Sequence, residues 1–311
     1  MNNAAINIHG ISKKYQSTIA LNEISFNIQD GELFGLIGAD GAGKSTLFRI
    51  LTTLILPDSG TAYVGDWEIT RNYRKIRKSI GYMPGKFSLY QDLTIEENLE
   101  FFATTFGTKI QENYDLIKDI YQQLRPFKNR RAGALSGGMK QKLALCCSLI
   151  HRPLVLFLDE PTTGVDPVSR TEFWNILKNL KKEGITILVS TPYMDEASLC
   201  ERIALIQKGD ILTIGTPEEI RTSYSSPLFE IRCDESMFQL VSDLEDYERA
   251  KSYFTFGQSL HYTDKINDGE EEKQLKSFLN RRGHSNISVR KITADIEDRF
   301  IELMADTASD I

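Results

Sequence analysis

The sequence predicts an α/β protein built around a parallel β-sheet, and three observations support that fold class. Residues 33–37 form an apolar run that leads through a glycine-rich segment into apolar spacing typical of a helix. Residues 154–158 form a second near-continuous apolar run, as expected of a parallel strand buried on both faces. Strand and helix patterns then alternate up to residue 206, which indicates parallel strands joined by helices.

The glycine-rich segment has the spacing G-x-x-x-x-G-K-[ST] of a phosphate-binding loop. Its glycines adopt backbone angles closed to other residues, so successive N–H groups can turn toward phosphate oxygens. The N-terminus of the following helix adds partial positive charge. Lys44 supplies a mobile cation for the terminal phosphates, and Ser45 supplies a hydroxyl for Mg²⁺. The nucleotide-binding residues predicted from this segment are Gly38, Ala39, Asp40, Gly41, Ala42, Gly43, Lys44, Ser45 and Thr46.

The composition is that of a globular protein with one large domain and a smaller one. The chain has 311 residues, of which 26% are charged and 41% hydrophobic. A net charge of −6 argues against nucleic-acid binding, which favours basic surfaces. No apolar run approaches the roughly 20 residues that span a bilayer, and residues 1–4 lack the pattern of a signal peptide. We therefore expect a cytoplasmic chain in which the adjacent Cys146 and Cys147 are buried thiols.

Upstream of the loop, residues 5–9 and 24–28 alternate with period two and predict a small β layer. Tyr15 lies between these two segments. An aromatic ring at this place can stack on adenine, and it can equally close the end of the sheet. Position alone does not separate these two roles.

Downstream of the loop, residues 80–83 are predicted as a short strand, and residues from about 94 to 149 are predicted to be mainly helical. The helical region begins at Thr94, an N-cap residue followed three positions later by Glu97. Inside it, residues 135–142 place a Ser-Gly-Gly sequence before helical apolar spacing. A serine and two glycines at a helix N-terminus form a second anion-binding corner.

Two carboxylates follow the apolar run at residues 154–158. Open α/β sheets bind ligands at the carboxyl ends of their strands, which is where these side chains stand. Asp159 is suited to hold Mg²⁺ through water, and Glu160 to polarise an attacking water molecule. A turn ending at Asp166, a helix over 169–182, a buried strand over 185–190 and an edge strand over 203–206 are expected next.

Residues 223–227 are expected to be a linker to a small C-terminal domain. Strand and helix patterns beyond it have the order of a split βαβ sandwich, with strands over 228–232, 252–256, 261–263 and 287–292 and helices over 235–250, 270–282 and 294–304. His261 and His284 have no partners at metal-ligand spacing, so we expect both to be surface histidines.

Taken together, residues 6–220 resemble the ATP-binding subunit of an ABC transporter. The resemblance implies a P-loop NTPase fold with a parallel core sheet, an N-terminal antiparallel β layer and a helical insertion over about 87–149. It makes 1–222 the ABC ATP-binding domain and 223–311 an accessory α+β domain. It also implies ATP and Mg²⁺ as ligands, with Ser45 and Asp159 at the metal, Glu160 as the catalytic residue and Tyr15 stacked on adenine.

The same resemblance implies that two such domains sandwich two ATP molecules head to tail. Each ATP would contact the phosphate loop of one domain and the signature of the other, with Asp166 ending the loop at the dimer interface. The segment at residues 296–303 is similar to the tail of subunits that serve ABC-2-type export permeases. The signature residues in this sequence are Leu135, Ser136, Gly137, Gly138 and Met139.

Two positions depart from the family pattern. Family members have a Gln after the strand at 80–83, where it contacts Mg²⁺ and the attacking water, but this chain has Gly85. Gln91 stands six residues further on and is expected to be out of reach. Members also carry a His that bonds the γ-phosphate and orients the catalytic Glu, whereas this chain has Pro192, which can donate nothing.

The resemblance therefore predicts an ATP-binding subunit that couples ATP binding and hydrolysis to export through a separate membrane permease, on the inner face of the membrane. The two departures predict a degenerate site on this chain's own phosphate loop, with impaired turnover. Its partner is then expected to be a different, complete ATP-binding subunit. The alternative is an ATP-binding regulatory subunit with negligible hydrolysis.

Overall fold

The computed structural model divides the chain into two units, Met1–Glu218 and Glu219–Asp310. It describes residues 4–224 and 226–309, so residues 1–3, used for the signal-peptide expectation, and residue 225 of the predicted linker lie outside it. The division falls inside the short helix α8 (Pro217–Thr222), close to the boundary predicted after residue 222. Within the described ranges, no helix is both long and apolar enough to cross a membrane.

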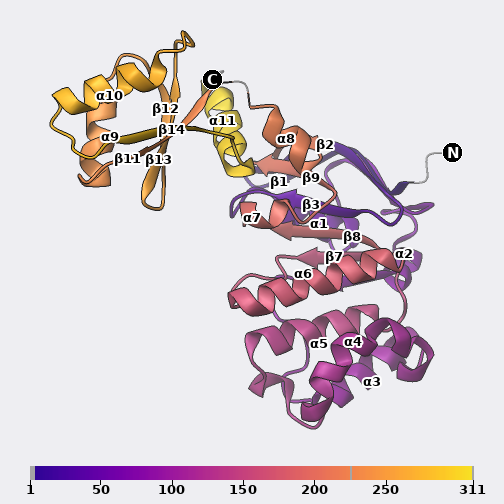
Figure 1. The fold of residues 1–311 in the computed structure, drawn as a ribbon. Helices are drawn as coiled ribbons and strands as arrows, with labels where there is room; N and C mark the ends of the chain where they lie inside the picture. Colours follow the sequence, from indigo (N-terminus) through magenta and orange to yellow (C-terminus); the bar gives the residue numbers. More distant parts are fainter. Residues whose placement is uncertain (1–3, 225, 310–311) are drawn as a thin grey trace. The chain divides into compact units, whose positions relative to one another are not determined.

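The first unit is organised around a six-stranded sheet of order β10-β9-β3-β8-β7-β6 (Figure 1). All neighbours from β9 to β6 are parallel, and every residue of β3 and β7 is buried, which confirms the predicted parallel core. The strands are β3 (Leu33–Ile37), β6 (Ile80–Met83), β7 (Val155–Asp159), β8 (Thr186–Thr191), β9 (Arg202–Gln207) and β10 (Asp210–Gly215).

The prediction that residues 203–206 form an edge strand was wrong. β9 pairs with β3 on one side and with β10 on the other, so β10 is the edge. Lys208 and Gly209 both have positive φ (47° and 88°), the backbone of a two-residue hairpin turn that returns the chain at once. The side chains of β10 are half-buried or exposed, so its sequence lacks the apolar run that identified the other strands.

A second sheet, wholly antiparallel, is formed by four strands from residues 4–68. Its order is β2-β1-β4-β5, with β1 (Ala4–Tyr15), β2 (Thr18–Gln29), β4 (Ser59–Val64) and β5 (Trp67–Glu68). The helix α1 (Lys44–Leu51) lies between this sheet and the core sheet, contacting β2, β4 and β7. One hydrophobic core joins the three layers, including Ile8, Phe48 and Phe157. The segment before α1 is thereby held at the carboxyl end of β3.

The predicted helical insertion is present. Thr94 caps α3 with the expected capping box: its side chain accepts from the Glu97 backbone N–H, and the Glu97 carboxylate accepts from the Thr94 N–H. The helices α3, α4 and α5 lie on the far side of α6 from β8 in Figure 1, and Cys146 and Cys147 are buried free thiols as predicted. The helical segments here are α3 (Ile95–Phe106), η1 (Ile110–Asn113), α4 (Tyr114–Leu124), η2 (Arg125–Phe127), η3 (Ala132–Ala134) and α5 (Gly137–Leu149). Elsewhere in the unit are α2 (Tyr73–Ser79), α6 (Pro167–Lys182) and α7 (Met194–Ala197).

The second unit contains an antiparallel sheet of order β12-β13-β11-β14, the order of the split βαβ sandwich that the sequence predicts. Its core contains Ile231, Leu240, Tyr262 and Leu275. Its elements are β11 (Leu228–Arg232), α9 (Met237–Glu245), β12 (Ala250–Phe256), β13 (Ser259–Asp264), α10 (Glu271–Arg281), β14 (Ser288–Ile292) and α11 (Ile296–Ser309).

The expectation of surface histidines in this unit was wrong. His284 is 5% exposed, and its ring contacts Cys233, Glu235 and Asp243. His261 is half-buried, with its Nδ1 2.7 Å from the Asp298 carboxylate. The partners of both histidines lie 37 or more residues away along the chain, so the spacing of residues in the sequence does not reveal them.

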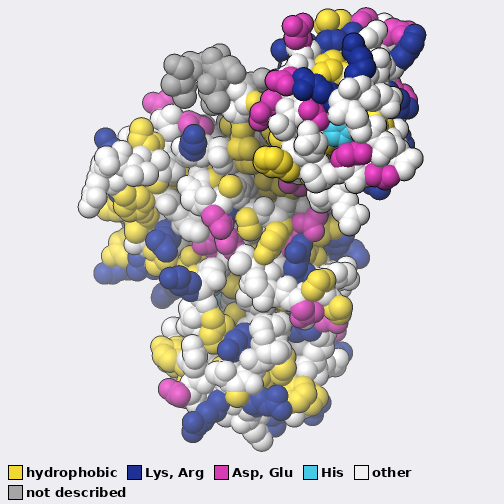
Figure 2. Space-filling model, turned by 90° about the vertical axis from the view of Figure 1, so that its left-hand side faces the viewer, with side chains coloured by type: hydrophobic (Ala, Val, Ile, Leu, Met, Phe, Trp, Pro, Cys, Tyr) yellow, Lys and Arg dark blue, Asp and Glu magenta, His cyan; other side chains and the backbone are white. Residues whose placement is uncertain are grey.

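Charged side chains of both signs are spread over the face of the molecule shown in Figure 2. Lys and Arg total 37 and Asp and Glu total 43 in the sequence. The net charge of the sequence is −6, and charges of both signs are intermixed on this face.

Candidate functional site

The predicted phosphate loop connects β3 to α1 through glycines that no other residue can replace without strain. Gly43 caps α1 with φ 111°, and Gly41 has φ 79°. A Cβ on Gly38 would lie 2.1 Å from the Ile206 carbonyl oxygen of β9. Ala39, Asp40 and Gly41 are exposed, so the backbone at the tip of the loop is open to a ligand.

Substituting Gly38 by Ala is therefore expected to destabilise the first unit. Overpacking a rigid site typically costs about 1–3 kcal/mol, and the clash with the Ile206 carbonyl involves backbone that cannot rotate away. Urea denaturation followed by circular dichroism measures the change. Gly137→Ala is the matched control, because a Cβ there meets nothing closer than 3.7 Å, and a shift within about 0.5 kcal/mol is expected. If the Gly38→Ala and Gly137→Ala variants were equally stable, the close packing of Gly38 on the Ile206 carbonyl would not limit this position.

Lys44 is the most constrained charged side chain of the loop. It is 3% exposed, and its Nζ donates to the carbonyl oxygens of Gly38 (2.8 Å) and Ala39 (3.1 Å). The same ammonium lies 3.1 Å from Oε1 of Glu160. The phosphate loop and the carboxylate after β7 are therefore joined by one cation.

Asp159 connects the phosphate loop to β8 through hydrogen bonds to two serine hydroxyls. Its Oδ1 accepts from Ser45 Oγ (3.1 Å) and from Ser190 Oγ (2.8 Å). Burial raises the pKa of Asp159, while the hydrogen bonds from Ser190 and Ser45 act in the opposite direction. A carboxylate beside a serine hydroxyl is a hard oxygen donor set of the kind that Mg²⁺ takes. The residues present fit the metal that the sequence predicts.

Glu160 is held in an uncommon backbone conformation. Its φ is 51°, and its N–H donates to Ser190 at the carbonyl oxygen (3.1 Å) and at Oγ (3.0 Å). Thr163 Oγ1 lies 3.5 Å from Oε2 of Glu160, and the other carboxylate oxygen contacts Lys44. A non-glycine residue in the left-handed region persists where its surroundings over-determine it, which is a feature of functional sites.

The signature segment lies at the N-terminus of α5. Ser136 is exposed and caps the helix, its Oγ accepting from the Met139 N–H at 3.4 Å. Gly138 packs so closely on α6 that a Cβ would lie 2.6 Å from Ser169 Oγ. Asp166 caps α6 by accepting from the Ser169 N–H at 3.0 Å, and these hydrogen bonds lower the pKa of Asp166. Ser169 therefore connects the signature to the loop that ends at Asp166.

Of the two departing positions, Gly85 lies beside the backbone of Asp159 and Glu160, and Pro192 follows the strand β8 that pairs with β7. A Cβ on Gly85 would be 3.2 Å from the Asp159 carbonyl oxygen and 3.9 Å from Cβ of Glu160. Pro192 follows the last residue of β8, two positions after Ser190. Gln91 accepts the Gly133 N–H at its carbonyl oxygen (2.9 Å), in the helical insertion.

Tyr15 ends β1 with 43% of its surface exposed, and Lys13 Nζ lies 5.8 Å from its ring centroid. The ring is available for stacking, and its contact with adenine stays a prediction. So do the nucleotide contacts of the other residues, including Thr46 and Leu135.

Sequence reasoning missed Ser190, which bonds both carboxylate residues. It lies directly opposite Asp159 in the parallel pairing of β7 and β8. A signal existed in principle, because the carboxyl ends of neighbouring parallel strands meet at one sheet edge.

Sequence reasoning also missed the network around buried Glu196, which accepts from Thr162 (3.0 Å) and Thr191 (2.5 Å) and pairs with Arg170 (3.1 Å).

The family model described as "ABC transporter" matches residues 21–163. The chain is 38% identical over 236 residues to the probable multidrug ABC transporter ATP-binding protein YbhF of Escherichia coli, covering 75% of this chain but only 41% of that protein. It is 38% identical over 223 residues to the Nod factor export ATP-binding protein I of Rhizobium sp., covering 71% and 73%. It is 35% identical to the doxorubicin resistance ATP-binding protein DrrA of Mycobacterium tuberculosis, covering 73% and 70%.

Solved structures show the same likeness. The cbiO1 subunit of Clostridium perfringens, part of an ABC transporter complex, aligns with a TM-score of 0.63 at 27% identity, over 71% of this chain and 92% of that one. The dimeric ATP-binding cassette MJ0796 bound to ADP and phosphate aligns with a TM-score of 0.62 at 26% identity, over 68% and 98%.

Proposed function

The chain belongs to the family of ABC transporter ATP-binding proteins, and we propose that it is the ATP-binding subunit of an export system. It couples ATP binding and hydrolysis to transport through a separate membrane permease of the ABC-2 type. The observation that carries the proposal is the convergence of Lys44, Ser45, Asp159 and Glu160 at the carboxyl ends of β3 and β7. Relatives named for Nod factor export and drug resistance support the export direction.

Nucleotide binding uses groups that already face one another. Lys44 exchanges its contacts with two loop carbonyls and Glu160 for oxygens of the terminal phosphates. Ser45 and Asp159 hold Mg²⁺, which neutralises phosphate charge when bound. The Glu160 carboxylate, released from Lys44, becomes free to orient a water molecule as general base. Tyr15 stacks on the adenine from the end of β1.

The chain's own phosphate-loop site is degenerate in this proposal. Gly85 provides no side chain beside Asp159, and Pro192 provides no donor where members of the family place a histidine. Removing one preorganised donor to developing charge costs about 10²–10³ in rate. The site binds MgATP and hydrolyses it poorly.

The signature completes a site on a second subunit. Ser136 and Gly137 are exposed at the N-terminus of α5, where their backbone and hydroxyl groups can meet a partner's phosphates. The partner is a different ATP-binding subunit with a complete catalytic set. Both are held at the inner face of the membrane by the permease.

Replacing Ser136 by Ala tests this role in the complex purified with its partner subunit and permease. We expect ATP turnover of the complex to fall by about 10²-fold, since a donor to the partner's ATP is removed. ATP affinity of the isolated chain should not change. Steady-state phosphate release and nucleotide binding measure the two quantities.

Ser236→Ala is the matched control for Ser136→Ala. Ser236 caps α9 with the same geometry, accepting from the Gln239 N–H at 3.3 Å, so it loses the same capping bond without touching the signature. Equal losses of turnover in both variants would show that helix capping alone explains the effect and would count against a role in trans.

An ATP-binding regulatory subunit with negligible hydrolysis is the second candidate. Gly85 and Pro192 favour it, because a clamp needs the phosphate loop but not the groups that complete the reaction. Turnover measured with and without the partner separates the candidates: a regulatory subunit changes the partner's rate even when Ser136 is replaced.

A further inference from the structure

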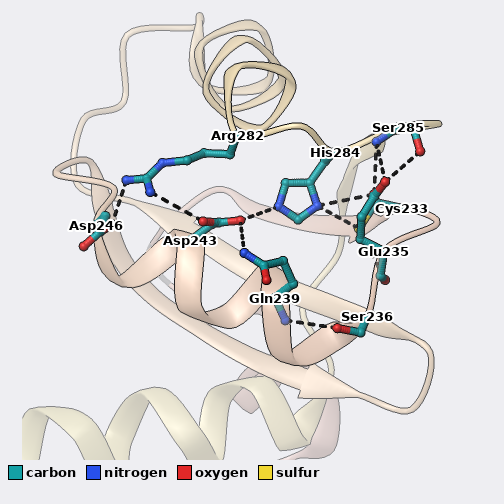
Figure 3. Close-up of polar contacts among 9 residues, drawn as sticks. All are labelled: Cys233, Glu235, Ser236, Gln239, Asp243, Asp246, Arg282, His284 and Ser285. Carbon is teal, nitrogen blue, oxygen red and sulfur yellow. Dashed lines mark hydrogen bonds and ion pairs between the residues drawn. The ribbon is translucent and has the colours of Figure 1, made fainter.

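Three side chains of different chemistry converge in the second unit (Figure 3). Cys233 follows β11, Glu235 precedes α9, and His284 stands between α10 and β14. One ligand atom from each lies within 4.8 Å of the others: the thiol sulfur, a carboxylate oxygen and an imidazole nitrogen. A thiolate, an imidazole and a carboxylate are the ligand types that Zn²⁺ takes in proteins.

The spacing of these atoms is close to that of a tetrahedral zinc site. Sγ of Cys233 lies 3.7 Å from Nδ1 of His284, and Nδ1 lies 3.4 Å from Oε2 of Glu235. Zinc bonds of about 2.3 Å to sulfur and about 2.0 Å to nitrogen and oxygen give tetrahedral edges of about 3.5 Å and about 3.3 Å. These two edges match within about 0.2 Å, and the third, between Sγ and the Glu235 carboxylate, is at most 4.8 Å, so a modest shift of the Cys233 or Glu235 side chain completes the site.

The histidine is oriented by a carboxylate on its other side. Nε2 lies 2.8 Å from Oδ2 of Asp243 on α9, and the imidazole ring is 1% exposed (Figure 3). An ionised carboxylate only accepts, so Nε2 carries the proton and Nδ1 presents its lone pair in the neutral ring. Nδ1 contacts the Glu235 carboxylate, which is also an acceptor, and the Cys233 thiol, which is a weak donor. Metal-binding histidines almost always donate their other ring N–H to a carboxylate, a backbone carbonyl or water, and Asp243 is such a partner.

The other two ligands are held ready by the same pair of segments. Both oxygens of Glu235 accept from the Ser285 N–H (3.0 Å), and Oε1 accepts from Ser285 Oγ (2.7 Å). These hydrogen bonds lower the pKa of Glu235 to about 2, and a lone pair remains on each oxygen for a metal. Burial raises the pKa of the Cys233 thiol, so the ion would displace its proton on binding.

We propose that Cys233, Glu235 and His284 bind one divalent transition-metal ion, preferentially Zn²⁺, with Asp243 orienting the imidazole. The fourth position is taken by water, since Cys233 and Glu235 are only partly buried. The ion joins the start of α9 to the segment between α10 and β14, which are about 50 residues apart in the chain. Its binding free energy then becomes folding stability of this unit.

Cobalt(II) is the probe, because a Co²⁺–thiolate bond gives a near-ultraviolet charge-transfer band that nitrogen and oxygen ligands do not. The full-length chain is stripped with chelator and titrated with Co²⁺ without nucleotide, which leaves the phosphate loop unable to recruit the ion through ATP. We expect a thiolate band that saturates at one ion per chain and is removed by Zn²⁺. The same Zn²⁺ should slow alkylation of Cys233, measured on its peptide by mass spectrometry.

Variants separate the ligands from their surroundings. Cys233→Ser is expected to abolish the thiolate band and His284→Gln to weaken binding at least about 100-fold, whereas Asp243→Asn weakens it by about 10–100-fold. His261→Gln is the matched control: His261 also contacts a carboxylate, Asp298, but no cysteine, and binding should be unchanged. Circular dichroism checks that each variant is folded.

If the wild-type chain shows no saturable thiolate band and Zn²⁺ does not protect Cys233 from alkylation, the cluster binds no metal. His284 then has a structural role only, linking the carboxylates of Asp243 and Glu235. The alkylation measurement needs no variant, so a misfolded substitution cannot leave the question open.

Discussion

Replacing Pro192 by His is expected to raise the ATP turnover of the isolated chain by about 10²–10³-fold. Pro192 lies two residues after Ser190, whose hydroxyl bonds Asp159 and whose carbonyl and hydroxyl accept from the Glu160 N–H. In the proposed function, a ring N–H placed here would donate to the terminal phosphate and orient Glu160, which proline cannot do. Phosphate release at saturating MgATP, over a range of protein concentrations that includes the dimer, measures the gain.

Two variants control this experiment. Pro192→Ala removes the proline ring without adding a donor and should leave turnover low. Pro192→His combined with Glu160→Gln should return turnover to the starting level, because the added donor has no base to orient. Adding Gly85→Gln is expected to increase turnover further, provided that the Asp159 carbonyl, 3.2 Å from the new Cβ, gives way slightly. The proposal of a degenerate site would be contradicted if the wild-type chain hydrolysed ATP as fast as a family member that has both the Gln and the His. Loss of that activity in Glu160→Gln would show that it comes from this site.

Replacing Lys44 by Ala is expected to weaken MgATP binding by at least about 10²-fold. Hydrogen bonds to charged groups contribute about 1.5–3 kcal/mol each, and the buried ammonium can make more than one to phosphate. Lys44 is also the only charged partner described for Glu160, so that carboxylate is left facing solvent through its 22% exposed side chain. Isothermal titration calorimetry with a non-hydrolysable ATP analogue measures the affinity.

Lys181→Met is the matched control for the Lys44 variant. Lys181 also pairs with a glutamate, Glu201 at 2.8 Å, but on α6 and away from the phosphate loop. Its loss should leave the affinity unchanged, as expected for an exposed ion pair. Unchanged affinity in Lys44→Ala as well would exclude the loop as the phosphate site.

Local patterns were sufficient for most of the first unit. The buried strands β3 and β7 could be predicted because parallel strands covered on both faces need continuous apolar runs. The cap at Thr94 could be predicted because a capping box is closed within four residues. The phosphate loop is equally local, since its glycines and Lys44 are consecutive in the chain. Membership of the family rests on such segments and their order.

The edge of the core sheet could not be predicted in the same way. β10 is half-exposed, so its sequence carries no apolar run, and its position beside β9 depends on a two-residue turn. The link between Ser190 and Asp159 depends on which strands are neighbours and in which register. These are properties of the assembled sheet.

The sequence by itself determined that this protein has a phosphate loop, paired carboxylates and a signature, because each is written in adjacent residues whose backbone conformation they dictate. It also placed Gly85 and Pro192 at the positions where the family pattern has a Gln and a His, which is the basis of the proposed degenerate site. Only the tertiary structure decided that Lys44 faces Glu160 and that His284 is buried between Asp243 and Cys233. Contacts between distant segments depend on how helices and strands pack, and spacing along the chain carries no record of them.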